Sequence, residues 1–346
     1  MIGDRRGNMR VLVPFAAFGA LLAAYSGYWL YLSHAVENSV LEELRTNWSE
    51  AGFEIKHGVL SVGGYPYRIE LTLRDIEVGT QDSAISFRWR TPIVLATAHP
   101  WDLSHWVVVA ERPSDMNFGM GQDRIVDLLI GRGRMSLKLA SDNVPERVSF
   151  DVRDVQMQQS VAPDVLDIKH AELHIRRVPT QSPSLDVAVF VKEIIVGESH
   201  GYPVGNRVQE LNAEISLQGP APASWSRSEF DAWRNAGGVV DVHNFQISWG
   251  DLELRFDGTF AIDEAYRPIG AASADIIGHG YLLTALSTEG IISEPSALAA
   301  GIALNFLTEP SSDDGRRVLR TPITVQDGYL HIGPVALVPL PALFSP

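Results

Sequence analysis

The sequence predicts a mainly β protein with some α structure: an N-terminal transmembrane helix, then curved antiparallel sheets with a few covering helices. Three observations predict this class. The chain opens with a long uncharged run, most of the remainder alternates apolar and polar residues with a period of two, and Gly, Pro, Ser and Asp bound the alternating stretches. Beyond the uncharged run lie about 310 residues, enough for one large or two ordinary domains.

The uncharged run extends from Val11 to Leu32. As a helix it measures roughly 33 Å, against about 30 Å for a hydrocarbon core. Arginines precede it and glutamates follow it, so the positive-inside rule places residues 1–10 in the cytoplasm and the body outside it. Aromatic residues at the outer end are expected at headgroup level; they are Tyr25, Tyr28, Trp29 and Tyr31.

A cleaved signal peptide is the alternative interpretation of this run. The run is longer than the usual core of about 7–15 residues, and its exit lacks a small-x-small cleavage site, so an uncleaved anchor is favoured. Within it Gly19, Ala23 and Gly27 recur at every fourth residue. Such a stripe lets two helices approach closely, which makes a homodimer through the anchor one expected partner arrangement.

The remaining elements follow from periodicity and boundary residues. Helical spacing of apolar residues predicts a juxtamembrane helix over 33–52. A first β-rich half is expected over 53–218, a linker over 219–225 and a second half over 226–346. Further helices are expected at the following ranges: 121–131, 226–235, 280–289 and 295–307.

One eight-residue pattern recurs in the strands, with apolar residues at positions 1, 3, 6 and 8 and a polar pair at positions 4 and 5. It occurs at 71–78, 150–157, 189–196 and 240–247. In a flat strand the first two apolar residues face opposite to the last two. A β-bulge in each copy would return all four to one face, and repeated bulges would bend the sheet into a trough or partial barrel.

Composition excludes several classes of function. The net charge of −14 disfavours nucleic-acid binding, and the absence of cysteine excludes thiolate chemistry. His170 and His174 fall in a predicted strand about 13 Å apart, too far to share a metal ion. Ser199 lies in a G-x-S-x-G match, but turn residues follow it where a hydrolase has a helix. No catalytic residue, metal or cofactor is therefore assigned.

Three blocks resemble a known family. Gly64–Leu71 resembles the Gly-aromatic-Pro-aromatic-Arg strand of an uncharacterised Gram-negative envelope family, domain of unknown function 2125. Residues 248–260 resemble its second block, and Pro322–Pro334 resembles its last. The resemblance implies an inner-membrane-anchored periplasmic protein, distantly similar to AsmA-like proteins, whose larger members are associated with lipid transfer along a β groove. It brings no catalytic residues.

The leading functional hypothesis is a non-enzymatic envelope protein that binds lipid or acyl chains in a concave β groove. Candidate groove residues are Trp89, Trp101 and Trp106, although the alternative that they are ordinary core residues is favoured. The inner membrane is the expected partner. A scaffold that docks an envelope protein complex is the alternative, and a hydrolase using Ser199 is third. The sequence leaves open whether helices over 280–307 fill the concave face.

Overall fold

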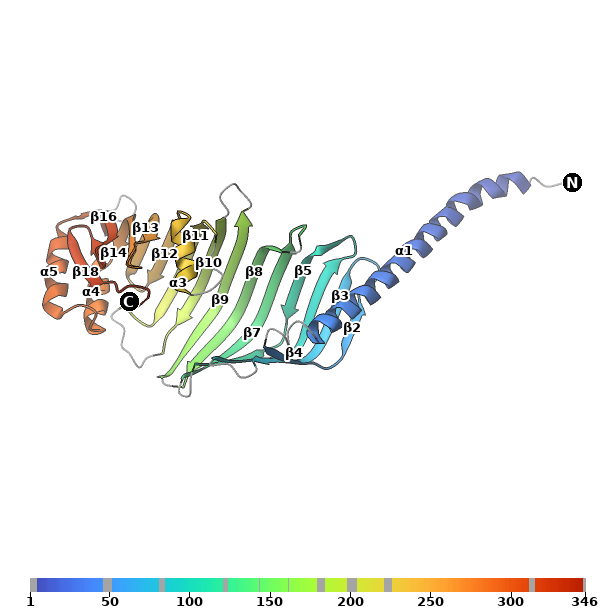
Figure 1. Ribbon diagram of the computed structural model, residues 1–346, viewed down its shortest axis with the longest axis horizontal. Coiled ribbons are helices and arrows are strands. Elements are labelled where there is room, and N and C mark those ends of the chain that lie inside the picture. Colours follow the sequence, from blue (N-terminus) through green and yellow to red (C-terminus); the bar gives the residue numbers. More distant parts are fainter. Residues whose placement is uncertain are drawn as a thin grey trace.

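The molecule is elongated, with one long helix leaving one end of a curved sheet and a helix pair at the other end (Figure 1). This computed structural model describes residues 5–45, 52–80, 85–120, 124–142, 144–160, 162–178, 184–197, 204–220, 226–310 and 315–344. The predicted fold class is confirmed, since the described residues form a mostly β structure with a large open antiparallel sheet and a few helices.

The described helices are α1 (Arg5–Arg45), α3 (Arg227–Asn235), α4 (His279–Thr288) and α5 (Glu294–Asn305). The strands of the first part are β1 (Phe53–Lys56), β2 (Leu60–Gly63), β3 (Ile69–Thr80), β4 (Ile85–His99), β5 (Asp102–Ala110), β6 (Ser114–Met120), β7 (Arg124–Leu139), β8 (Pro145–Gln159) and β9 (Ala162–Val178). Those of the second part are β10 (Ser184–Ile195), β11 (Arg207–Gln218), β12 (Val239–Trp249), β13 (Leu252–Ile262), β14 (Pro268–Ile277), β15 (Thr308–Pro310), β16 (Arg317–Gln326), β17 (Tyr329–Ile332) and β18 (Val335–Pro339).

Strands pair mainly in the order of the chain, and every pairing is antiparallel. β3 pairs with both short strands β1 and β2, and β5 and β6 together fill the place between β4 and β7. From β7 to β14 each strand pairs with the next one, and β16 to β18 complete the sheet. The two ends of the sheet lie at opposite ends of the molecule, so it is an open trough (Figure 1).

The helix predicted over 121–131 is wrong for its described part. Residues 124–130 belong to β7, and residues 121–123 lie outside the described residues. Val126, Leu128 and Ile130 are partly buried, whereas Ile125 and Leu129 are exposed on the other face. Because both faces carry apolar residues here, the period of two is hidden in the sequence.

The N-terminal helix is continuous from Arg5 to Arg45 and includes the expected anchor, 11–32, and most of the range 33–52. It is long and apolar enough over Val13–Leu44 to cross a membrane. The division into two β-rich halves at 219–225 stays a prediction. There β11 and β12 pair directly along most of their lengths, and residues 221–225 lie outside the described residues.

In each copy of the eight-residue pattern, the alternation of side chains between the two faces of the sheet is interrupted near position 5. The interruption has two different structural causes. In the first three copies position 5 has a left-handed backbone: φ is 50° at Asp75, 50° at Asp154 and 54° at Glu193. Register is kept on both sides of these residues, so the predicted one-residue slip is wrong there. Only the fourth copy has the slip, between Val242 and Phe245 of β12.

These left-handed residues belong to one line that crosses the sheet, which we call the seam. The seam takes one residue from each successive strand or strand junction, and each lies opposite the next: Gly58, Asp75, Pro92, Pro113, Gly131, Asp154, Lys169, Glu193 and Gln209. A Cβ on Gly131 would lie 3.1 Å from Asp154 Cβ, and the two prolines need no ladder partner for an N–H. The residue types therefore suit an interruption of regular pairing.

The seam bends the sheet toward one face. Ile76 and Val78 on one side of it and Val94 on the other form a single buried cluster, to which Leu73 and Trp89 also contribute. All of these residues come from strands, yet the first three are at most 9% exposed. The sheet itself must shield them, so their face is the concave one and the seam forms the bottom of the trough.

Helices α4 and α5 cover the C-terminal end of this concave face. Leu283 of α4 and Leu304 of α5 pack against Ile276 of β14 and Leu319 of β16, all nearly inaccessible. Ser293 caps α5 by accepting a hydrogen bond from the Ser296 N–H, and Pro295 fits the first turn of α5. The larger buried apolar cluster of the described residues therefore lies at this end of the molecule.

Candidate functional site: the concave apolar face

The concave face carries an unbroken row of apolar side chains along the trough. Residues that stand directly opposite in antiparallel strands share a face, so a row can be followed from strand to strand. The row runs through Val62, Leu71, Ala96, Val108, Met135, Phe150, Leu173, Val189, Ala213, Phe245, Phe256 and Ala274. At about 4.8 Å between strands it is roughly 53 Å long.

Parallel rows widen this apolar surface. One begins at Trp106 and continues through Leu137, Val148, Ile175, Val187, Ile215 and Val242. Beyond the seam another begins at Trp89 and continues through Met116, Leu128, Met157 and Leu166. Charged side chains are absent from these three rows, so hydrocarbon placed here would meet apolar atoms alone.

Two of the three candidate tryptophans therefore lie on the concave face. Trp89 and Trp106 are partly buried at the N-terminal end of the trough. Trp101 lies in the turn between β4 and β5, is 66% exposed and stacks on His99 with ring centroids 4.9 Å apart. The structure thus separates Trp101 from the groove, while the assignment of all three as ligand contacts stays a prediction.

The middle of the trough is accessible. Phe150, at the centre of the first row, is 37% exposed, and its neighbours Met135 and Leu173 are only partly buried. Of the described helices, α4 and α5 pack on β13, β14 and β16, and α1 lies against β2. Helix α3 lies at the strand ends of β11 and β13, where Trp233 donates to the Gln218 carbonyl and Arg234 donates to the Asp263 carbonyl. Helices within 280–307 therefore close one end of the concave face and leave its middle uncovered.

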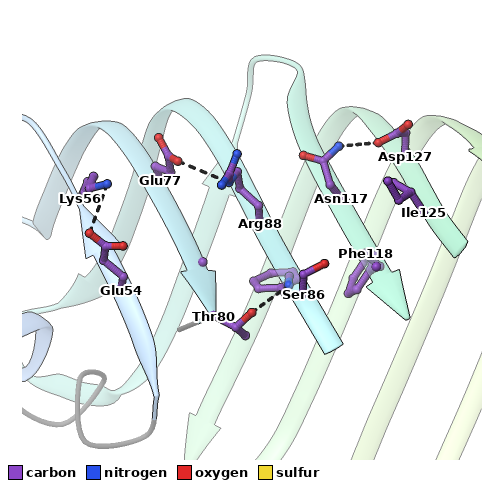
Figure 2. Close-up of a pocket in the computed structure, with 13 residues that line it drawn as sticks. Glu54, Lys56, Glu77, Thr80, Ser86, Arg88, Asn117, Phe118, Ile125 and Asp127 are labelled. Atoms are coloured by element: carbon purple, nitrogen blue, oxygen red, sulfur yellow. Dashed lines mark hydrogen bonds and ion pairs between the residues drawn. The ribbon is translucent and has the colours of Figure 1, made fainter. Parts of the chain in front are cut away.

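The convex face carries most of the charged side chains of the sheet, and many of them form ion pairs. Figure 2 shows a pocket on this face near the N-terminal end, where Glu54 meets Lys56 at 3.1 Å and Glu77 meets Arg88 at 3.6 Å. Farther along, Arg176 meets Asp186 at 2.6 Å. Exposed pairs of this kind contribute little to stability, and they suit a solvated surface.

The strongest shift of pKa in the described residues is at Asp102, where the pKa falls to about 2. Ser104 donates a short hydrogen bond to this carboxylate, and Lys138 Nζ lies 3.1 Å from Asp102 Oδ2. Lys138 Nζ also donates to Ser104 Oγ at 2.7 Å. The three groups satisfy one another, so this cluster stabilises the β5–β7 pairing and offers no free acid or base.

Histidines on the convex face lack the geometry of a catalytic or metal site. His170 and His174 contact carboxylates of β8 and β9, and the described residues contain no group of three potential metal ligands. Ser216 Oγ donates to Asp186 and lies 2.8 Å from His243 Nε2. The serine stands between acid and imidazole here, whereas a hydrolase needs the imidazole in the middle. Ser199 lies outside the described residues.

Helix α1 is joined to the N-terminal end of the trough. Trp29 is 6% exposed, and its indole N–H donates to the Arg68 carbonyl at 3.1 Å. Tyr28 Oη donates to the Pro100 carbonyl at 2.8 Å, and Tyr25 Oη donates to the Pro66 carbonyl. Three of the four residues expected at headgroup level thus contact the body, while Tyr31 is 73% exposed.

The remaining anchor residues lie on α1 as predicted by their spacing. Gly19, Ala23 and Gly27 are exposed, and a Cβ on either glycine would meet nothing within 4 Å. Val11 belongs to the helix. Leu32 is partly buried, and the next residue, Ser33, is 5% exposed. The small-residue stripe is therefore free of contacts with the described body, and a homodimer through it stays a prediction.

Sequence reasoning missed the apolar rows as a site, although their signal was present. Strand after strand carries Val, Leu, Ile or Phe at alternate positions, but the sequence does not give the register that aligns them.

A family model described as "Uncharacterized protein conserved in bacteria (DUF2125)" matches residues 29–341. A search of curated proteins gives no match, and a search of solved structures gives none.

Proposed function

The chain belongs to the bacterial family DUF2125, and on that premise we propose that it is a membrane-anchored, non-enzymatic envelope protein that holds acyl chains in its trough. We propose further that α1 stays in the inner membrane with the N-terminus in the cytoplasm, and that the body lies in the periplasm. The distant similarity to AsmA-like proteins, which the family resemblance implies, is part of the same proposal.

The observation that carries the proposal is the uncovered apolar row. An exposed apolar patch of this extent on a water-soluble body is costly unless something binds to it. At roughly 53 Å the row exceeds the hydrocarbon thickness of a bilayer, about 30 Å, so it can accept the acyl chains of at least one lipid. The open middle at Phe150 gives such chains access from the side.

The contacts of α1 support an anchor over a cleaved signal. Trp29 and Ser33 are buried against the body, and Tyr25 and Tyr28 bond to its turns. Removal of the helix would expose these contact surfaces and leave the Arg68 and Pro100 carbonyls without their partners. A helix that completes the fold in this way is expected to remain attached.

Photocrosslinking in cells tests lipid binding. The photoreactive residue p-benzoylphenylalanine replaces Phe150 on the concave face, in the full chain. The matched control replaces Phe190 of β10, which faces Glu172 and Asn212 on the convex side. Mass spectrometry after irradiation is expected to find a lipid adduct at position 150 and none at position 190.

Two results would overturn the proposal. One is the absence of lipid at position 150 when the protein is folded and irradiated. The other is a stoichiometric protein adduct at position 150, which would favour the scaffold, because an envelope protein would then occupy the trough.

A further inference from the structure

Two turns of the body lie beside α1 at the entrance of the trough. The β2–β3 turn contacts the helix through Tyr65, whose Oη lies 2.8 Å from Ser26 Oγ and whose ring meets that of Trp29 edge to face. The β4–β5 turn contacts it through the Pro100 carbonyl, which accepts from Tyr28. Both turns are thus held at the level of residues 25–29 of α1.

That level lies within the reach of the membrane. The uncharged run of α1 begins at Val11, and a hydrocarbon core of about 30 Å spans roughly 20 helical residues, to a point near residue 31. Tyr25 lies only about 21 Å along the helix from Val11. Residue 29 lies about 27 Å from Val11 on the same scale, so turns attached at residues 25–29 lie within about 9 Å of the outer boundary of a hydrocarbon core that begins at Val11.

The side chains of these turns suit that depth. Tyr67 is 75% exposed, Trp101 is 66% exposed and Tyr65 is 51% exposed. No Asp, Glu, Lys or Arg occurs in 91–101 or in 59–67. Tyrosine and tryptophan prefer the interface between headgroups and hydrocarbon, where an apolar ring and a polar tip are both satisfied.

We propose that Tyr65, Tyr67 and Trp101 form an aromatic collar that inserts into the interface of the same bilayer that α1 crosses. The collar seats the N-terminal end of the trough on the membrane, so its apolar rows begin at the leaflet surface. This inference rests on the proposed membrane crossing of α1, but it does not require lipid in the trough.

The absence of cysteine in the chain makes a clean test available. Single-cysteine variants of the full chain, Tyr67→Cys and Trp101→Cys, carry an environment-sensitive fluorophore in nanodiscs of phosphatidylethanolamine and phosphatidylglycerol. Phe18→Cys, inside the anchor, is the positive control. Tyr329→Cys, 48% exposed at the far end of the sheet, is the matched negative control.

Lipids with a nitroxide near the headgroup are expected to reduce the fluorescence at positions 67 and 101 about twofold or more, because aromatic side chains at the interface lie at that depth. Lipids with a nitroxide deep in the acyl chain are expected to quench position 18. Position 329 is expected to respond to neither. Circular dichroism of each labelled variant confirms that the fold is retained.

The outcomes separate the collar from its premise. Quenching at position 18 without quenching at 67 and 101 would overturn the collar and leave the anchor standing. Absence of quenching at all three positions would overturn both. Quenching at 67 and 101 without position 18 would place the two turns at a membrane surface that α1 does not cross, which would overturn both the crossing and the collar as proposed.

Discussion

Single residues with a left-handed backbone shape this sheet. Asp75, Asp154 and Glu193 each turn the strand over without shifting its register, so apolar residues before and after them share the concave face. A non-glycine residue in this conformation costs about 1–2 kcal/mol, and Asp tolerates it better than branched residues do. The sequence showed the change of facing through its polar pair, but a bulge and a left-handed residue explain that pattern equally well.

Substitution of Asp154 tests this role. Asp154→Val is expected to destabilise the fold by about 1–2 kcal/mol, because a β-branched side chain disfavours positive φ. Asp154→Gly, which adopts positive φ freely, is expected to be neutral or stabilising. Its exposed pair with Lys169, 3.3 Å long, contributes little. Thermal unfolding followed by circular dichroism measures both, and equal midpoints for the two variants would contradict the expectation.

At the scale of elements, the individual strands and helices were predicted better than the way in which the strands pair with one another. The alternation of β3 and the caps of α3 and α5 are local signals, and the structure has these elements close to the predicted bounds. β7 was missed between 124 and 131 because apolar residues occupy both of its faces there. The seam could not be predicted, since it exists only where registers of many strands coincide.

The junction of α1 with the body is an element-scale contact that mutation can break. Trp29→Ala removes a nearly buried indole and its hydrogen bond to the Arg68 carbonyl. A loss of about 3 kcal/mol in unfolding free energy is expected, as for other buried aromatic residues. Tyr31→Ala, at a position 73% exposed on the same helix, is the matched control and is expected to change little. Equal thermal midpoints for the two variants would show that the junction does not stabilise the fold.

At the scale of the whole molecule, the two faces of the sheet differ in polarity. The rows through Leu173 and Val189 are apolar, whereas Glu172 and Glu214 stand on the opposite face. The sequence predicted a curved sheet and a groove, and the curvature is confirmed. The openness of the groove could not be predicted, because it depends on where α4 and α5 pack.

Two adjacent positions on β10 separate the faces sharply. Val189→Lys places a charge in the trough, while Ala188→Lys places the same charge beside His174 and Glu214 on the convex face. Burying a cation among acyl chains is unfavourable, so Val189→Lys is expected to reduce the lipid adduct at p-benzoylphenylalanine 150 by about tenfold. Ala188→Lys is expected to leave it unchanged. A similar yield in both variants would show that lipid does not occupy the concave face at β10.

The pairing of strands in chain order has a consequence for biogenesis. Each new strand can add to an edge that is already complete, so the sheet can grow outward from the end that carries α1 while the rest of the chain is still being made. Contacts between neighbours in sequence are quick to form, which shortens the time for which a naked edge is open to aggregation. The helix pair α4 and α5 comes late in the chain and closes the growing end last.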